Sequence, residues 1–324
     1  MLIGALTSFV VSLILGILAI PLLRRMRAGQ TILKYVEEHK TKNGTPTMGG
    51  LFLVLSAIIV FFLFCGRAGR ISVVSVTIGL SFMAVGFIDD FLKIHHSQNQ
   101  GLKAYQKVLF QLVISIFAGV FAYINGITVF YLPFTRLTLD LGFFTVPIVA
   151  LVFIAITNSV NLTDGLDGLA GGVSATYLGF IAVIIFLQIT LFKNLYLLSS
   201  EYYNLIMLSA CLVGAVLGFL ALNVNKAKVF MGDTGSLSLG GFIGAISVFS
   251  SNSFFIPILG ITFVMSSISV IIQVLHFKRT GKRIFLMAPL HHHFQHKNCT
   301  ETQISYWYFL ATLITGVLSV LPYL

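Results

Sequence analysis

The sequence predicts an all-α polytopic membrane protein with about ten transmembrane helices. Hydrophobic residues make up 57% of the 324-residue chain and charged residues only 9%, whereas about one quarter of a soluble domain is charged. The apolar runs are roughly 20 residues long and nearly free of charge, which is typical of membrane-spanning helices and not of barrel strands. We expect one integral membrane domain over residues 1–324.

Ten apolar runs are the candidate spans. They cover residues 2–23, 46–66, 71–92, 106–124, 143–160, 168–190, 203–222, 235–251, 254–277 and 302–322. The first run lacks a basic start and a small-residue cleavage site, so we expect a retained helix and not a signal peptide. Residues 127–141 alternate apolar and other residues on both sides of Pro133, which predicts a small β-hairpin outside the membrane.

The basic residues are divided unequally between the two ends of these spans. Counting the loops on alternate sides assigns sixteen Lys and Arg residues to one side and four to the other. The positive-inside rule makes the richer side cytoplasmic and places both termini outside. Eight of the ten acids share the cytoplasmic side, so we expect the active site there. The net charge of +10 then reflects topology, anionic headgroups and phosphorylated substrates, and nucleic acid is not needed to explain it.

Residues 158–172, which read NSVNLTDGLDGLAGG, are the most unusual stretch. Asp164 and Asp167 are three apart, which places both carboxylates on one face of a helical turn. The glycines around them allow backbone N–H groups to approach a ligand. Acids in a membrane-like sequence indicate a functional site. The alternative is a solvated loop in which Thr163 or Asp164 caps a helix.

Two adjacent acids, Asp89 and Asp90, lie at the cytoplasmic end of the third span. Neighbouring carboxylates repel each other, so the pair requires a cation or a shared proton. Asp89 and Lys93 are spaced i,i+4 and are expected to form a helical ion pair. That pair accounts for only one of the two aspartates, which favours a functional role.

Residues 228–236 read KVFMGDTGS and open the eighth span. Asp233 is a candidate Mg²⁺ ligand beside a helix N-terminus, because Mg²⁺ is held by one or two carboxylates together with substrate phosphates. The alternative is that Asp233 or Thr234 only caps the helix. Phe230 either stacks on a base or packs in the protein.

Two further segments are weaker signals. Residues 44–50, GTPTMGG, are a helix start with a proline in the first turn, and the nearby Lys42, like Lys107, binds either anionic lipid or phosphate. His291, His292 and His293 are consecutive and point in different directions, so we do not expect them to share a metal. Neutral imidazoles donating to a phosphate or a sugar are one interpretation, and a solvated loop is the other.

Together the motifs GTPTMGG (44–50), DDFLK (89–93), NSVNLTDGLDGLAGG (158–172), KVFMGDTGS (228–236) and APLHHHF (288–294) resemble those of a known family. In this order and spacing they are similar to the bacterial phospho-N-acetylmuramoyl-pentapeptide transferases, within the polyprenyl-phosphate N-acetylhexosamine-1-phosphate transferase superfamily. The resemblance implies ten helices, Mg²⁺ dependence, a homodimer and a cytoplasmic active site in the bacterial cell membrane. It also implies the reaction of UDP-MurNAc-pentapeptide with undecaprenyl phosphate to give lipid I and UMP.

The resemblance also implies residue roles. Asp233 would bind Mg²⁺, Asp89 and Asp90 would serve the attacking lipid phosphate, with Asp89 as its base, and His292 would complete the catalytic group. The nucleotide site would be lined by Asn161, Asp164, Asp167 and Phe230. The phosphates and the sugar would be surrounded by Lys42, Thr47, Lys93, Lys107, Gln273, His291 and His293. Direct attack and a covalent phospho-aspartate intermediate are both compatible with this set.

The chain departs from the family pattern at several positions. Gln295 replaces the usual Glu, Asn298 and Cys299 replace Gly and Trp, and Trp307 replaces an Arg. The departures affect the loop that carries the histidines and leave the metal and nucleotide residues unchanged. A sister transferase that uses UDP-GlcNAc is one alternative. A transporter is another, but its coupling residues would lie near the bilayer midplane, whereas these acids gather at one edge.

Overall fold

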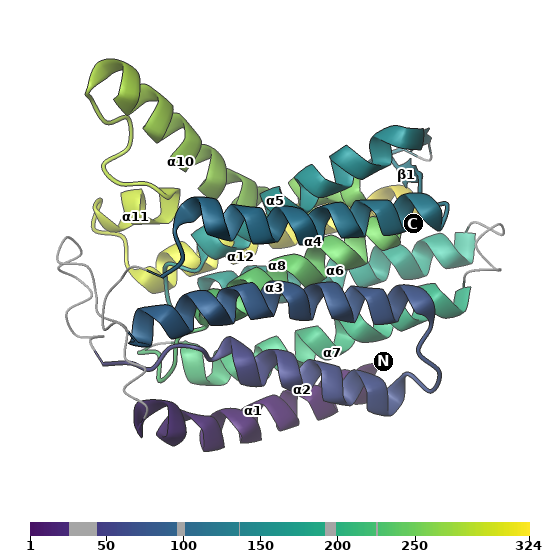
Figure 1. Cartoon of the computed structure of the whole chain (residues 1–324), viewed down its shortest axis with the longest axis horizontal. Coiled ribbons are helices and arrows are strands. Elements are labelled where there is room, and N and C mark those ends of the chain that lie inside the picture. Colours follow the sequence, from purple (N-terminus) through teal and green to yellow (C-terminus); the bar gives the residue numbers. More distant parts are fainter. Residues whose placement is uncertain (26–43, 96–100, 136, 192–198, 225) are drawn as a thin grey trace.

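The computed structural model describes residues 1–25, 44–95, 101–135, 137–191, 199–224 and 226–324. The helices are α1 (Leu2–Arg25), α2 (Gly50–Phe64), α3 (Arg70–His95), α4 (Ala104–Ile124), α5 (Thr145–Thr163), α6 (Leu169–Leu191), α7 (Ser199–Asn223), α8 (Gly232–Phe249), α9 (Ile256–Leu259), α10 (Ile261–Thr280), α11 (Leu290–Gln295) and α12 (Glu301–Val320). Most of them run side by side in one bundle (Figure 1).

Eight helices in the described part of the chain are long and apolar enough to cross a membrane. They are α1, α3, α4, α6, α7, α10, α12 and the helix that ends at Thr163. α2 is a shorter apolar helix of 15 residues. The structure therefore confirms a polytopic helical protein.

α8 is the central helix of the bundle, and nearly all of its residues from Thr234 to Phe249 are buried. Small residues make this possible, because they let neighbouring backbones approach closely. A Cβ at Gly240 would collide with the α5 backbone at Thr157, and one at Gly244 would press on Phe153. The first turn of this buried helix carries Asp233.

The expected ninth span, residues 254–277, is not one continuous helix. α9 ends at Leu259, Gly260 has φ −95° and ψ 30°, and α10 begins at Ile261. From this break α10 leans away from the bundle, toward the end where α11 lies (Figure 1). The break is a matter of local backbone geometry, which the run of apolar residues does not reveal.

The predicted hairpin is present. β1 (Val129–Tyr131) pairs antiparallel with β2 (Thr138–Asp140), with Phe130 opposite Leu139. The Tyr131 N–H donates to the carbonyl of Ser251 at 2.9 Å, which ties the hairpin to the segment after α8. Both chain termini lie nearer to this end of the bundle than to the end that carries α11 (Figure 1).

A buried amide pair joins α6 to the segment after α8, near the hairpin. Gln188 of α6 and Asn252 donate to each other at 2.8 and 2.9 Å, and Gln188 also donates to the Tyr323 hydroxyl at 3.2 Å. Gln188 and Asn252 are both buried, so loss of one amide leaves the other without its partner.

We therefore expect Asn252→Leu to lower the free energy of unfolding by about 1–3 kcal/mol, the cost of a buried polar group that has lost its partner. The double variant Gln188→Leu/Asn252→Leu should lose less, because no orphaned amide remains. Thermal unfolding in detergent compares the three proteins. A double variant less stable than Asn252→Leu would contradict this account.

Candidate active site

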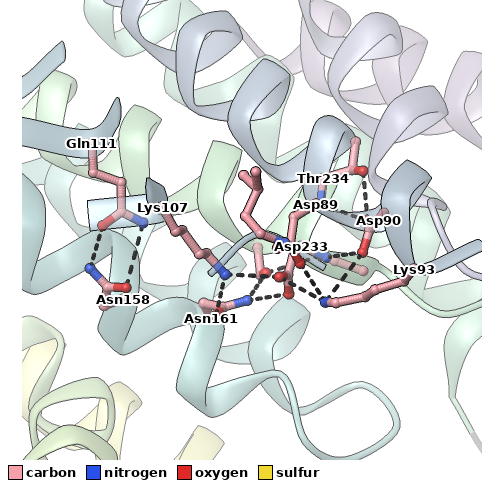
Figure 2. Close-up of polar contacts among 12 residues, drawn as sticks. Asp89, Asp90, Lys93, Lys107, Gln111, Asn158, Asn161, Asp233 and Thr234 are labelled. Atoms are coloured by element: carbon pink, nitrogen blue, oxygen red, sulfur yellow. Dashed lines mark hydrogen bonds and ion pairs between the residues drawn. The ribbon is translucent and has the colours of Figure 1, made fainter. Parts of the chain in front are cut away.

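Three carboxylates from two helices converge at one end of the bundle. Asp89 and Asp90 lie near the end of α3, and Asp233 lies in the first turn of α8. One carboxylate oxygen from each lies within 4.8 Å of the others. The approach depends on Gly86, since a Cβ there would collide with the Asp233 backbone. The sequence predicted each acid separately, and the structure brings them together (Figure 2).

Asp90 holds the beginning of α8. Its carboxylate accepts hydrogen bonds from the backbone N–H of Asp233 at 3.2 Å, the N–H of Thr234 at 2.9 Å and the Thr234 hydroxyl at 2.7 Å. These are free N–H groups of a first helical turn, which an N-cap residue normally satisfies from its own chain. Here the cap comes from another helix. Asp90 is only 2% exposed, and its oxygens are directed at α8.

Asp233 is the centre of the polar network. One oxygen accepts from Lys93 at 3.0 Å and from Lys107 at 2.8 Å, and the other accepts from the Asn161 amide at 2.7 Å. These partners come from α3, α4 and α5 respectively. Four helices therefore meet at a single carboxylate, and each contributes one polar side chain (Figure 2).

Asp89 has a different environment from its neighbour. It forms the expected ion pair with Lys93, and its other oxygen accepts from the Leu102 N–H at 2.8 Å. Lys93 also lies 3.9 Å from Asp90, so one ammonium group contacts all three acids. The i,i+4 ion pair exists, but it is one part of a larger network.

The three acids form a donor set that suits Mg²⁺. All available ligand atoms are carboxylate oxygens, the hard ligands that this ion prefers. Three negative charges face two ammonium groups, Lys93 and Lys107, so a net negative charge remains inside a buried site. A divalent cation would compensate that charge, and the residues present therefore fit the ion that the sequence suggested.

Sequence analysis gave no role in or beside this site to Gln111, Asn158 or Ser236, and it named Thr234 only as a possible helix cap. Gln111 of α4 and Asn158 of α5 form an amide pair, with Asn158 donating at 2.7 Å (Figure 2). Ser236 accepts from Asn161 at 2.9 Å, and Thr234 binds Asp90. Spacing could have indicated Gln111 and Asn158. Gln111 is four residues after Lys107 and Asn158 is three before Asn161, so each lies on the same helix face as a predicted site residue.

The loop after α5 carries the two other acids. The pKa of Asp164 is raised to about 8, first because burial penalises the charged form, and then because Asp233, Asp90 and Asp167 add negative charge nearby. The Asp167 carboxylate accepts from the Ala227 N–H at 3.0 Å. Asp164 and Asp167 therefore have different surroundings, although they are three residues apart.

Asp167 also connects this loop to the last helix. Its N–H donates to the Glu301 carboxylate at 3.4 Å, and the neighbouring Gly168 N–H donates to Asn223 at 2.8 Å. Glu301 begins α12 and is a site neighbour that sequence analysis did not single out. Nothing in its local sequence distinguishes it from an ordinary acid in a first helical turn.

The three histidines lie on α11 and have three different sets of partners. His291 is buried against the acidic loop, where a Cβ at Gly165 would collide with its ring. His292 Nδ1 lies 2.6 Å from the side-chain oxygen of Gln295, and His293 Nδ1 accepts from the Leu286 N–H at 3.1 Å. Gln295, a departure from the family pattern, thus binds a histidine directly.

The remaining predicted residues are distributed as follows. Thr47 is buried beside Gly232, whose Cβ would meet the Thr47 hydroxyl. The Phe230 backbone pairs with Pro46 and Gly49, and its ring is half-buried. Gln273 binds the backbone of Ile284 and Phe285, not the acids. Lys42 lies outside the described residues.

The raised pKa of Asp164 predicts a pH dependence of stability. Between its ordinary pKa of 3.8 and about 8, the folded protein holds a proton that the unfolded chain has lost. Stability contributed by this group therefore falls as pH rises through that window. We expect the unfolding temperature of metal-free Asp164→Asn in detergent to fall less than that of the parent protein between pH 6 and pH 8.5. Identical pH dependences would refute the assignment.

Comparison with known proteins identifies the family. The glycosyl transferase family 4 model matches residues 71–251, and phospho-N-acetylmuramoyl-pentapeptide-transferase signature 1 matches residues 42–54. The chain is 41% identical over 318 residues to the phospho-N-acetylmuramoyl-pentapeptide-transferase of Clostridium novyi (strain NT), covering 97% of this chain and 94% of that protein. It is 38% identical over 320 residues to the Bacillus subtilis (strain 168) protein of the same name, covering 97% and 95%. With this site, these matches and nearly complete coverage, the chain belongs to the phospho-N-acetylmuramoyl-pentapeptide-transferase family.

Proposed function

We propose that this protein transfers phospho-MurNAc-pentapeptide from UDP-MurNAc-pentapeptide to undecaprenyl phosphate, releasing UMP and forming lipid I. The observation that carries the proposal is the network at Asp233, in which two lysines and an amide surround a carboxylate at the start of a buried helix. Phosphoryl transfer depends on positioning and charge neutralisation more than on covalent chemistry by the protein. Similarity over nearly the whole chain to transferases of this name supports the same substrates.

The membrane topology that we propose has ten crossings in a bacterial cell membrane. Eight of these crossings are the long apolar helices, and we add α2 and α8 as the other two. α8 is enclosed by its neighbours. Both termini would lie outside and the carboxylate site would face the cytoplasm, where the positive-inside rule places the basic loops. A single domain and a homodimer also belong to this proposal, and the family resemblance supports the homodimer.

The metal would be held by Asp233, with Asp89 beside it. Bound Mg²⁺ supplies positive charge that neutralises the diphosphate. Lys93 and Lys107 already converge on the same carboxylate, and in the complex they would bind phosphate oxygens. Asp89 would take the proton of the lipid phosphate, because the Asp90 carboxylate already accepts hydrogen bonds from the first turn of α8.

The other residues would position the substrates. Asn161, Asp164, Asp167 and Phe230 would line the nucleotide site, and Thr47, Lys42 and the three histidines would surround the phosphates and sugar. The network modifies one role. We propose that Asp90 is a positioning residue, which holds Asp233 through the first turn of α8 and does not touch the reacting atoms.

The test of the function is transfer in detergent with undecaprenyl phosphate and labelled UDP-MurNAc-pentapeptide, with Mg²⁺ or EDTA. We expect a labelled lipid and UMP with Mg²⁺ only. Asp233→Asn should lower turnover by about 10²–10³, the scale for losing a group that stabilises transition-state charge. Asp140→Asn, an exposed acid of the hairpin, is the matched control. Turnover with UDP-GlcNAc but not with the MurNAc donor would replace this function by the sister reaction.

The positioning role of Asp90 predicts coupling with Thr234. Asp90→Asn and Thr234→Val should each raise the Mg²⁺ concentration needed for half-maximal turnover. The double variant should be little worse than the poorer single variant, because both changes disturb one contact. Full additivity of the two effects would show that Asp90 acts independently of α8.

A further inference from the structure

A cavity of about 650 Å³ lies between α10 and the chain that returns from it to α11. That volume is within the range of small-molecule sites, roughly 300–1,000 Å³. Its polar lining includes Lys278, Arg283 and His296, and its apolar walls include Val274, Phe277 and Leu286. None of the described residues that line it is acidic. The proposed function assigns no role to Lys278, Arg283 or His296.

The wall of this cavity is fixed by hydrogen bonds. α10 ends at Thr280, and the left-handed conformation of the next residue, Gly281 (φ 67°), reverses the chain. Gln273 then holds the returning segment, because it accepts from the N–H of Ile284 at 3.0 Å and of Phe285 at 2.9 Å, and donates to the Phe285 carbonyl at 3.0 Å. The binding surface is therefore formed before any ligand arrives, which reduces the cost of ordering.

Among the residues that the structure describes, no acid pairs with Lys278 or Arg283 of the cavity. The Arg283 guanidinium donates to the Leu286 carbonyl at 3.4 Å, which orients it along the returning segment. A guanidinium and an ammonium group that line the same cavity can together bind a carboxylate or a phosphate.

The two faces of α10 carry different side chains, and they suit different ligands. The face lining the cavity carries Gln273 and Lys278 among its apolar residues. The opposite face exposes a run of large apolar side chains before Arg279, including Ile268, Ile272 and Leu275, and this part would face lipid. An acyl or prenyl chain fits that second face better, whereas the cavity suits a ligand with both methyl groups and anionic groups.

The cavity is also continuous with the histidine helix. Leu286 lines it and donates its N–H to His293, and Met287 and Ala288 line it immediately before α11. In turn, His291 packs on the acidic loop at Gly165. A ligand group extending from the sugar site past the histidines would therefore enter this space.

We propose that this cavity binds the peptide of the donor, with Lys278 and Arg283 receiving its carboxylates. The inference rests on the proposed function, in which the donor carries a pentapeptide whose C-terminus is a free carboxylate. Small apolar peptide side chains would contact Val274, Phe277 and Leu286, while the charged ends meet the cations. The site would thereby separate peptide-bearing donors from the bare sugar nucleotide.

The test is ligand binding to the detergent-solubilised full chain, measured for UDP-MurNAc-pentapeptide and for UDP-MurNAc without peptide. We expect Lys278→Gln/Arg283→Gln to weaken pentapeptide-donor binding at least about tenfold, as loss of charge-assisted hydrogen bonds does. The affinity of this double variant for UDP-MurNAc should equal that of the parent protein. The matched control is Arg279→Gln/Lys282→Gln, which removes the same charge from the same turn outside the cavity lining, and it should bind both ligands normally.

Three results would overturn the proposal. If Arg279→Gln/Lys282→Gln weakened pentapeptide-donor binding as much, the basic turn would attract anions or anionic headgroups in general. If Lys278→Gln/Arg283→Gln weakened the binding of both nucleotides equally, the two cations would contact the diphosphate and not the peptide. Weakened binding of undecaprenyl phosphate, with normal binding of both nucleotides, would assign the cavity to the lipid. Binding is measured without turnover, so a missing lipid product would count against the proposed reaction and leave this test intact.

Discussion

The close contact between the end of α3 and the first turn of α8 is the constraint on which the rest of the site depends. Gly86 allows the two backbones to meet, and Asp90 then supplies the hydrogen bonds that the start of α8 needs. Because α8 is enclosed by its neighbours, water cannot cap it easily, and an unsatisfied N–H in such a place is costly. The cap from α3 satisfies these groups and at the same time places Asp233.

Buried charge is the second theme of the structure. Three carboxylates share two lysines, and Asp233 alone receives three side-chain donors. Such an arrangement is expensive in a low-dielectric environment and is found where a site must receive further charge. The residual negative charge is suited to a divalent cation, and the lysines are suited to phosphates. The same residues thus form the empty site and supply the charges that the proposed reaction would need.

The three consecutive histidines of α11 make different contacts. His291 packs on the acidic loop, His292 contacts Gln295 and His293 holds the returning chain. Gln273 serves the same returning chain. His293 and Gln273, which the family resemblance suggests as substrate ligands, therefore shape the wall of a neighbouring cavity. This arrangement connects the sugar-side histidines with a space in which cations are available.

The sequence by itself determined the membrane class and the hairpin and singled out the candidate acids of the site, because hydropathy, charge asymmetry and short motifs are local properties of the chain. Asp89, Asp90, Asp164, Asp167 and Asp233 were all singled out in this way. The tertiary structure alone decided that Asp90 caps α8, that Glu301 approaches Asp167 and that the ninth apolar run breaks at Gly260. These features arise from contacts between residues more than a hundred positions apart or from backbone geometry, and neither leaves a periodic pattern in the sequence.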